Sequence, residues 1–470
     1  MRYLSGFLCF LCCVFLSVGV ATSKKVAPNN KQDVMLSYAP VVKKVAPAVV
    51  NIYTKRVVQQ QRRNPFYRRS PLMNDPFFQH FFEGRPMRKR LESSLGSGVI
   101  LSAEGLMVSN AHVVRGAEEI TAVFSDGREY QAKIVLKDER TDLAILQIKT
   151  NGDKLPFVTL ADSDTAEIGD IVLAIGNPFG VGQTVTGGIV SAISRAATSI
   201  NDFNFFIQTD AAINPGNSGG ALVGMDGKVI GVNTAIYSRD GGSLGIGFAV
   251  PSNMVRVVAD AAQSGDQVKR AWLGVSTQKV STDIAQSLGL KRPKGALVTG
   301  MHDLSPAEKA GLKVGDLIVS LNGKEVDEPA SMRFRSALLD IGDDIVLGVL
   351  RKGDKKQIRF KSIPAPEDVP RDTATLKGNH PFNGAVVENL SPAVIEELGT
   401  RRLPVTKGVI VRKVLRPLRF GVKAGDIVHE VNSQKIKTVE DLKKAIEKPS
   451  RFWSVQINRG GQMLNIRISG

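Results

Sequence analysis

The stretch GNSGGALVGMDGKVIGVNT, residues 216–234, places one serine among glycines and follows it with two apolar runs joined at Asp226-Gly227. Its first five residues satisfy G-x-S-x-G, the nucleophile turn of α/β-hydrolases, which requires a helix directly after the serine. Two β-like runs around an Asp-Gly turn predict a β-hairpin instead. The hairpin excludes the hydrolase interpretation and places Ser218 in a β-rich domain.

The chain around this hairpin consists of short strand-like runs from Ser97 to about Pro251, separated by turn signals such as Asp126-Gly127 and Asp240-Gly241. Many even strands without intervening helices are typical of closed or paired antiparallel barrels. The first helical period appears at SNMVRVVADAAQS, residues 252–264, which Ser252 can cap. We therefore predict a mainly β fold with a double-barrel domain over residues 93–266.

The sequence repeats itself beyond Arg270. AGLKVGDLIVSLNGKEV (310–326) aligns with FGVKAGDIVHEVNSQKI (420–436), so that Gly311 matches Gly421 and Asp316 matches Asp426. Self-similarity at one offset indicates a duplicated module. We predict the two copies at residues 270–363 and 382–470, with the proline- and charge-rich segment 364–381 as a linker.

The N-terminus has the layout of a secretory signal peptide. Residues 1–23 contain Arg2, a long apolar run and small residues, and lysines follow directly. The alternative is an uncleaved membrane anchor, for which the apolar run is borderline in length. The three cysteines of the chain, Cys9, Cys12 and Cys13, all lie in this segment. The exported chain therefore has no disulfide and is not a thiol enzyme.

The net charge of +17 is concentrated in the N-terminal segment 24–92. Between Lys55 and Arg90 ten basic residues stand against two acidic ones, interleaved with six phenylalanine and tyrosine rings. Such a loop can contact an anionic membrane or single-stranded nucleic acid. Alternatively, it is an insertion whose rings pack on a neighbouring subunit. Because an exported protein seldom meets nucleic acid, we expect no nucleic-acid partner and keep peripheral membrane contact as one role for the loop.

A serine hydroxyl needs an imidazole to accept its proton and a carboxylate to orient that imidazole. His112, at the end of the strand-like run LMVSNAH, is the one histidine of the five that lies in the domain of Ser218; the others are His80, His302, His380 and His429. Nine aspartates lie between His112 and Ser218. Asp142 stands directly before an apolar strand, and Asp162 and Asp164 are the alternatives.

The glycines before and after Ser218 have a second use. A tetrahedral intermediate carries negative charge on the former carbonyl oxygen, which backbone N–H groups can stabilise. The N–H groups of Gly216 and Ser218 could both point at this oxygen if Gly216 adopts a conformation closed to residues with a Cβ. We therefore predict an oxyanion hole formed by these two residues.

The motifs SNAHVV, TDLAILQI and GNSGGAL, in the order His, Asp, Ser, are similar to those of the HtrA/Deg (Do-like) serine endoproteases, and the resemblance covers essentially the whole exported chain. It implies a chymotrypsin-like double β-barrel followed by two PDZ-like domains. It also implies His112 as general base, Asp142 as its orienting carboxylate and Ser218 as nucleophile. In digestive relatives of this fold an aspartate precedes the serine, whereas here the residue is Asn217. Activation by a buried new N-terminal ammonium is therefore not expected, and we expect activity to depend on the ordering of loops instead.

The resemblance also places the substrate pocket. Ala212 stands six residues before the nucleophile, at the base of the pocket in trypsin-like enzymes, with Ile213 beside it and Ile236 and Ile246 expected on the walls. Such a pocket should prefer small aliphatic side chains such as Val or Ala. The alternative is a preference for Lys or Arg, for which the carboxylate of Asp210 lies nearby.

In the PDZ-like modules, WLGVS (272–276) and FNGAV (382–386) match the loop that receives a peptide C-terminus. In the first copy this assigns peptide binding to Trp272, Leu273, Gly274 and Val275. Asn383 stands where the second copy should be apolar, so assembly is an equally good role for that copy.

Together these features predict an ATP-independent periplasmic endoprotease that degrades unfolded proteins. The sequence has no phosphate loop or metal-ligand cluster, so we expect no cofactor and no metal. The resemblance implies homotrimers, higher homo-oligomers and chaperone activity. The alternative is a non-proteolytic PDZ chaperone or scaffold that keeps a silent protease domain.

Overall fold

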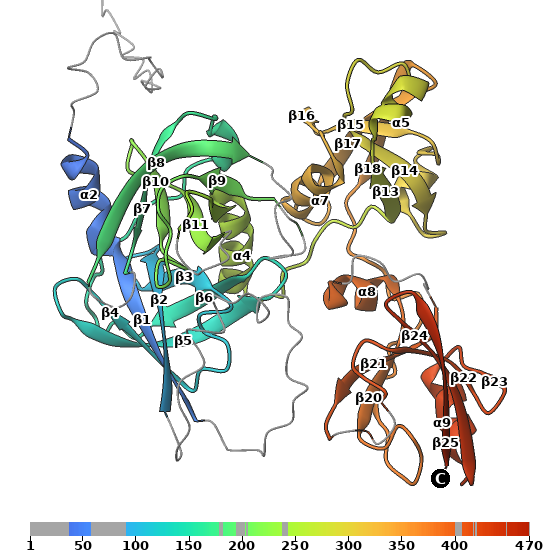
Figure 1. Cartoon of the computed structure of the whole chain (residues 1–470). Helices are drawn as coiled ribbons and strands as arrows, with labels where there is room; N and C mark the ends of the chain where they lie inside the picture. The colour runs from blue at the N-terminus through green and yellow to red at the C-terminus, as the bar shows by residue number, and fades with distance from the viewer. Residues whose placement is uncertain are drawn as a thin grey trace, which may run out of the picture. The chain divides into compact units, whose positions relative to one another are not determined.

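The computed structural model describes residues 37–57, 91–177, 182–193, 203, 205–236, 243–399, 407–416, 418, 421–447 and 449–469. The predicted signal peptide and nearly all of the basic loop lie outside these residues. Within the described part, strands dominate and form two closed barrels and two open sheets (Figure 1). The mainly β fold class is confirmed.

The first barrel closes in the order β1-β2-β3-β6-β5-β4. Its strands are β1 Val49–Val57, β2 Leu91–Ile100, β3 Leu106–Asn110, β4 Glu119–Val123, β5 Glu129–Asp138 and β6 Leu143–Ile148. Two short helical segments, α2 (Ala39–Val45) and η1 (Ala46–Ala48), precede it. The side chains of Ile52, Met107 and Leu146 are fully buried inside. β1 falls in the range 24–92, predicted above as an N-terminal segment, so the barrel begins before residue 93. The sequence does not reveal this because the basic insertion separates β1 from its partner β2 along the chain.

The second barrel closes in the order β10-β11-β12-β9-β8-β7. Its strands are β7 Ile171–Gly176, β8 Thr184–Ile193, β9 Ile207–Thr209, β10 Ala221–Gly224, β11 Val229–Ile236 and β12 Gly247–Pro251. β10 and β11 pair antiparallel, with Ala221 opposite Val232, which confirms the hairpin after Ser218. A short helical turn, η2 (Ser163–Thr165), lies between the barrels in sequence.

Helix α4 (Ser252–Ser264) ends the double-barrel domain where the helical period predicted it. Ser252 does not cap this helix: Pro251 is the N-cap residue and makes no side-chain capping bond. The Ser252 hydroxyl instead donates to the carbonyl of Ala161 at 2.8 Å, which ties the helix to the chain before η2. Gly265, at φ 72°, ends the helix.

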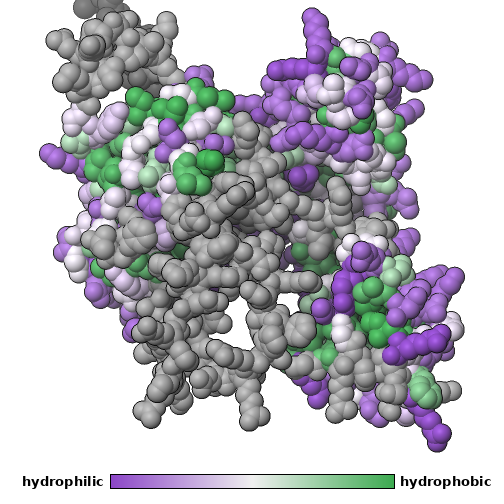
Figure 2. Space-filling view, in the orientation of Figure 1, coloured by the Kyte–Doolittle hydropathy of each residue, from purple (hydrophilic) through white to green (hydrophobic). Residues whose placement is uncertain are grey.

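The first PDZ-like domain has the sheet order β13-β14-β15-β17-β18, with β16 paired to β15. Its elements are β13 Val275–Lys279, α5 Thr282–Ser287, β14 Ala296–Met301, α6 Pro306–Lys309, β15 Leu317–Leu321, β16 Lys324–Glu325, α7 Pro329–Ala337, β17 Asp344–Arg351 and β18 Asp354–Lys361. Its surface is mostly hydrophilic in Figure 2.

The second PDZ-like domain repeats this order and adds one strand at the end, β19-β20-β21-β22-β24-β25, with β23 paired to β22. Its elements are β19 Ala374–Thr375, β20 Ala385–Asn389, α8 Pro392–Leu398, β21 Val409–Val414, β22 Ile427–Val431, β23 Gln434–Lys435, α9 Val439–Glu447, β24 Phe452–Arg459 and β25 Gln462–Ser469. The segment 364–381 that we expected to be a linker therefore contributes a strand to this sheet.

Candidate active site

His112 and Asp142 meet because β3 pairs with β6. The register places Asn110, the last residue of β3, opposite Leu143, the first residue of β6. The turns that adjoin these strand ends are joined by the Ala111 N–H and the Asn110 amide, which donate to the Asp142 carbonyl at 3.0 and 2.9 Å. Asp142 itself adopts φ 59°, in the left-handed region that non-glycine residues seldom enter. The strand pairing thus brings two residues 30 positions apart to one place.

The Asp142 carboxylate holds His112 at two points. Its Oδ1 accepts from the backbone N–H of His112 at 3.0 Å, and its Oδ2 lies 2.7 Å from His112 Nδ1. The side chain of Asp142 is buried and that of His112 nearly so. A carboxylate on Nδ1 favours the tautomer in which the proton sits on Nδ1 and Nε2 carries a lone pair, which is the arrangement required of a general base.

Thr234, on β11, links Asp142 to Ser218 and was missed by the sequence reasoning. Its hydroxyl donates to Asp142 Oδ2 at 2.8 Å, and its carbonyl accepts from the Ser218 hydroxyl at 3.2 Å. Thr234 is buried and belongs to the second barrel, whereas Asp142 belongs to the first. The one available signal was its position, as a hydroxyl residue at the end of the hairpin that follows Ser218.

The loop that carries Ser218 is fixed from both barrels. Within the loop, the Asn217 N–H donates to the Asn214 carbonyl and the Gly220 N–H donates to the Asn217 carbonyl. From the second barrel, the carbonyl of Asn233 on β11 accepts from the Gly219 N–H. Gly216 and Gly219 adopt φ 95° and φ 84°. A Cβ on Gly219 would overlap the Ser97 carbonyl oxygen, so both the conformation and the space require glycine there.

Ser97, on β2, holds this loop from the first barrel and was also missed. Its N–H donates to the Ser218 carbonyl at 2.8 Å, and its hydroxyl donates to the Gly216 carbonyl at 2.6 Å. The same hydroxyl accepts from the Asn177 N–H at 3.0 Å. Gly216 itself adopts φ 95°, a conformation that residues with a Cβ rarely enter.

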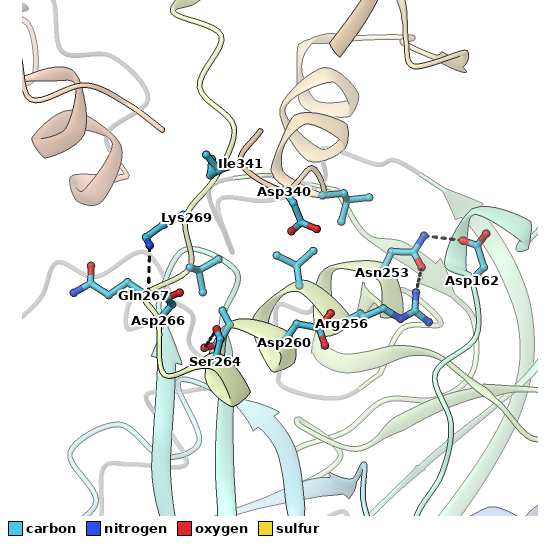
Figure 3. A pocket seen from close by; sticks show the side chains of 14 residues that line it. Asp162, Asn253, Arg256, Asp260, Ser264, Asp266, Gln267, Lys269, Asp340 and Ile341 are labelled. Atoms are coloured by element: carbon cyan, nitrogen blue, oxygen red, sulfur yellow. Dashed lines mark hydrogen bonds and ion pairs between the residues drawn. The ribbon is translucent and has the colours of Figure 1, made fainter. Parts of the chain in front are cut away.

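The alternative acids lie elsewhere. Asp162 accepts from Asp164 N–H as the cap of η2 and from the Asn253 amide of α4 at 2.7 Å. Figure 3 shows Asn253 between Asp162 and Arg256. The hydrogen bond from Asn253 is the main reason why the pKa of Asp162 lies below its ordinary value. Among the three candidates, Asp142 is the one that the fold places on His112.

The predicted pocket residues differ in their surroundings. The Ala212 carbonyl accepts from the Thr186 hydroxyl at 2.8 Å. Ile213 is fully buried, and a Cβ on Gly247 would meet its Cδ1 at 2.7 Å. Ile246 is half-buried against the core, and the side chain of Ile236 lies outside the described residues. The carboxylate of Asp210 accepts from Ile189 N–H at 2.7 Å and so is engaged by the backbone of β8.

The predicted peptide loop of the first PDZ-like domain lies directly before β13. Trp272 N–H donates to Ile363 at 2.8 Å, and its ring meets that of His302 edge-on at 5.4 Å. The Leu273 carbonyl accepts from the Ser305 hydroxyl at 2.7 Å. Gly274 has φ 68°, and Val275 begins the strand. The loop is therefore anchored on both sides of Gly274.

Comparisons with known proteins identify two domain types in the chain. Residues 96–232 match the model of the trypsin-like peptidase domain, and residues 271–361 match that of the PDZ domain. The chain is 37% identical to the periplasmic serine endoprotease DegP of Salmonella typhimurium over 464 residues, which covers 95% of this chain and 94% of the relative. It is 36% identical to DegP of Escherichia coli K12 over 459 residues, with 94% and 93% covered.

Among solved structures, the HtrA-type protease AlgW with a decapeptide is 42% identical, with a TM-score of 0.52; the match covers 70% of this chain and 99% of AlgW. Two six-stranded barrels with these sequence matches define a trypsin-like serine endopeptidase that carries PDZ domains. The chain belongs to the HtrA/DegP family of serine endoproteases.

Within the part of the chain that the structure describes, no helix is both long and apolar enough to cross a membrane.

Proposed function

We propose that this endoprotease uses Ser218 as nucleophile, His112 as general base and Asp142 as the carboxylate that orients His112. The observation that carries the proposal is the 2.7 Å contact between His112 Nδ1 and Asp142 Oδ2, with Asp142 Oδ1 also fixed by the His112 N–H. This double attachment holds both the position and the tautomer of the imidazole.

The reaction would be acyl transfer. The Ser218 oxygen attacks the carbonyl carbon of the scissile peptide while His112 Nε2 takes the hydroxyl proton. The oxyanion is stabilised by the N–H groups of Gly216 and Ser218, each such donor contributing about 3 kcal/mol to lowering the barrier. His112 returns the proton to the leaving amine, and water then hydrolyses the acyl-enzyme by the same route.

We further propose that the natural substrates are unfolded proteins of the periplasm, cleaved without ATP after small aliphatic residues. Ala212, Ile213, Ile236 and Ile246 would form the pocket. The names of the DegP relatives support the compartment, and the decapeptide in the AlgW structure supports peptide capture. Trp272, Leu273, Gly274 and Val275 would bind peptide C-termini by adding a strand beside β13.

We also propose that the chain assembles as a homotrimer and larger homo-oligomers and has chaperone activity, as the family resemblance implies. The apolar side chains of unfolded proteins would be the recognised feature in both activities. Native mass spectrometry of the purified protein would measure the assembly, with multiples of three subunits expected.

The test of the catalytic assignment is cleavage of casein by the purified chain without nucleotide, beside Ser218→Ala and the control Ser264→Ala. Ser264 lies on α4, and its hydroxyl donates to the carbonyl of Ala261 in the same helix at 3.0 Å. We expect rapid cleavage by the wild type and the control, and none by Ser218→Ala. If the wild type cuts no faster than Ser218→Ala at elevated temperature, the chain is instead a binding protein with a silent protease domain.

A further inference from the structure

The two PDZ-like domains differ at one sheet edge. In the first domain β13 ends the sheet and its described strand partner is β14. Its counterpart in the repeat is β20, which pairs with β21 in the same way but carries β19 on its other side. The edge of β20 that corresponds to the proposed peptide site of β13 is therefore covered by a segment of the same chain.

The covering segment makes backbone hydrogen bonds along the whole of β20. Ala374 lies opposite Val387 and Thr375 opposite Val386, antiparallel. At one end Leu376 N–H donates to Ala385 at 2.9 Å, and at the other Asn389 N–H donates to Arg371 at 2.8 Å. An extended peptide that enters a PDZ domain adds a strand to a sheet edge in this manner.

Leu376 occupies the place of a peptide's last residue. Its carbonyl accepts from the Gly384 N–H at 2.8 Å, and Gly384 is the central residue of the loop FNGAV, the match to WLGVS. The Leu376 side chain is 4% exposed and belongs to the same apolar core as Phe382 and, from α9, Ile446. The carbonyl therefore stands in for a terminal carboxylate, and the side chain fills the apolar pocket behind it.

Side chains present only in the second domain hold the segment. Asn389 donates to the Pro370 carbonyl at 2.7 Å and to Asp372 at 3.2 Å, and its oxygen accepts from Val439 N–H of α9 at 2.6 Å. Arg371 pairs with Glu367 and Glu397. The residue that matches the buried Asn389 in the first domain is Lys279, which points to Glu328 at 3.0 Å.

We propose that Arg371–Leu376 is an internal ligand of the second PDZ-like domain, which keeps its peptide groove closed unless the segment is displaced by a peptide C-terminus of similar chemistry, ending in an aliphatic residue. A ligand tethered by a short connection acts at an effective concentration of about millimolar or more. Free peptide therefore enters the first domain before the second. The inference rests on the peptide-binding role proposed above for β13.

The test uses the full chain with Ser218→Ala and the peptide RDTATL with a free carboxylate, the sequence of residues 371–376. Hydrogen exchange is followed at β20 and at β13. Without further change we expect the peptide to leave exchange at β20 unaltered. In Leu376→Gly it should slow exchange there, with an apparent affinity at least about tenfold higher because the competing segment is weakened. Met463→Gly, at an exposed residue of β25, is the control and should behave as the unmodified chain.

Equal protection of β20 in the unmodified chain and in Leu376→Gly would overturn the proposal, as would a folded Leu376→Gly that never protects β20. If Leu376→Gly does not fold, exchange in the unmodified chain without peptide decides. The amide of Gly384 should then exchange more slowly than that of Gly274, because it donates to the Leu376 carbonyl. Faster or equal exchange at Gly384 would contradict the proposal. Protection of β13 by the peptide reports separately on the function proposed for the first domain.

Discussion

Thr234 contacts two of the three residues proposed for catalysis, through its hydroxyl to Asp142 and its carbonyl to Ser218. We predict that Thr234→Val lowers kcat with little change in KM, because the acid loses one donor while the substrate pocket is unaltered. A hydrogen bond to a charged group is worth about 1.5–3 kcal/mol, or about ten- to a hundredfold in rate. The measurement is steady-state cleavage of a short peptide.

Thr234→Ser keeps the hydroxyl and should retain most of the activity. The control Thr121→Val removes an exposed hydroxyl of β4 that accepts from Gln131 at 3.0 Å, and should leave kcat unchanged. Wild-type kcat in Thr234→Val would contradict a positioning role for this residue.

Gly219 combines a left-handed φ of 84° with close packing against the Ser97 carbonyl. We predict that Gly219→Ala lowers the unfolding temperature clearly more than Gly127→Ala does. At Gly127, with φ 87°, no described atom lies within 4 Å of an added Cβ, so the cost there is the left-handed strain of about 1–2 kcal/mol alone. Thermal unfolding of both variants in the Ser218→Ala background measures the difference. Equal shifts would mean that the loop relaxes around the methyl group.

The two aspartates that match in the repeat, Asp316 and Asp426, each bind an arginine of the last long hairpin of their PDZ-like domain. These hairpins are β17-β18 and β24-β25. Arg351 donates to both oxygens of Asp316 and to the Gly311 carbonyl, and Arg459 does the same for Asp426 and Gly421. The matched glycine and aspartate in the repeat are therefore two contacts of one arginine. The sequence alignment detected the two ends of this arrangement but not the arginine that joins them.

Burial tends to raise the pKa of Asp316, but the hydrogen bonds from Arg351 and from Lys313 N–H outweigh it, so the pKa lies below the ordinary value. Because the pKa is lower in the folded state, the ionised carboxylate stabilises the domain at pH values above its unfolded pKa of about 3.9. This stabilisation is lost as the pH falls through the folded-state pKa. We predict that Asp316→Asn destabilises the first PDZ-like domain at pH 7 and that this difference from wild type shrinks below about pH 4.

Urea unfolding followed by Trp272 fluorescence measures this, in a Trp453→Phe background that leaves Trp272 as the only tryptophan. Asp344→Asn, at an exposed carboxylate paired with Lys361, is the control and should change little at any pH. A difference between wild type and Asp316→Asn that is constant from pH 7 to pH 3 would rule out the ionised carboxylate as its cause.

For the whole molecule, the placement of all three cysteines before residue 14 makes export testable by chemistry. We predict that the protein isolated from the periplasm begins near residue 22 to 24, gains no mass with N-ethylmaleimide and still cleaves casein. A serine-directed phosphonofluoridate should abolish the cleavage. A maleimide adduct on the intact protein would show that the N-terminal segment remains attached as an anchor.

Much of the fold could be predicted because its signals are local. The Asp226-Gly227 turn, the helix at 252–264 and the repeat depend on neighbours in sequence, and His112 and Ser218 stood out by residue type. The rest depends on partners distant along the chain. β1 was not assigned to the first barrel because the basic insertion separates it from β2, and β19 because a two-residue strand in a charged segment carries no periodic pattern.

The signals for a β-rich domain and for a duplicated C-terminal module lie in consecutive residues, because strand alternation and turn chemistry are local. The order of the His, Asp and Ser motifs carried the resemblance to serine endoproteases. The residues alone left several aspartates open as the partner of His112, and the family resemblance implied Asp142; the contact itself follows from the tertiary pairing of β3 with β6. The tertiary structure also showed that Thr234 and Ser97 join the two barrels at Ser218 and that residues 371–376 cover β20. The contacts of Thr234 with Asp142 and of Ser97 with Ser218 join segments far apart in sequence, whose register local patterns do not encode. The pairing of β19 with β20 is closer in sequence, but a two-residue strand carries no periodic pattern that would predict it.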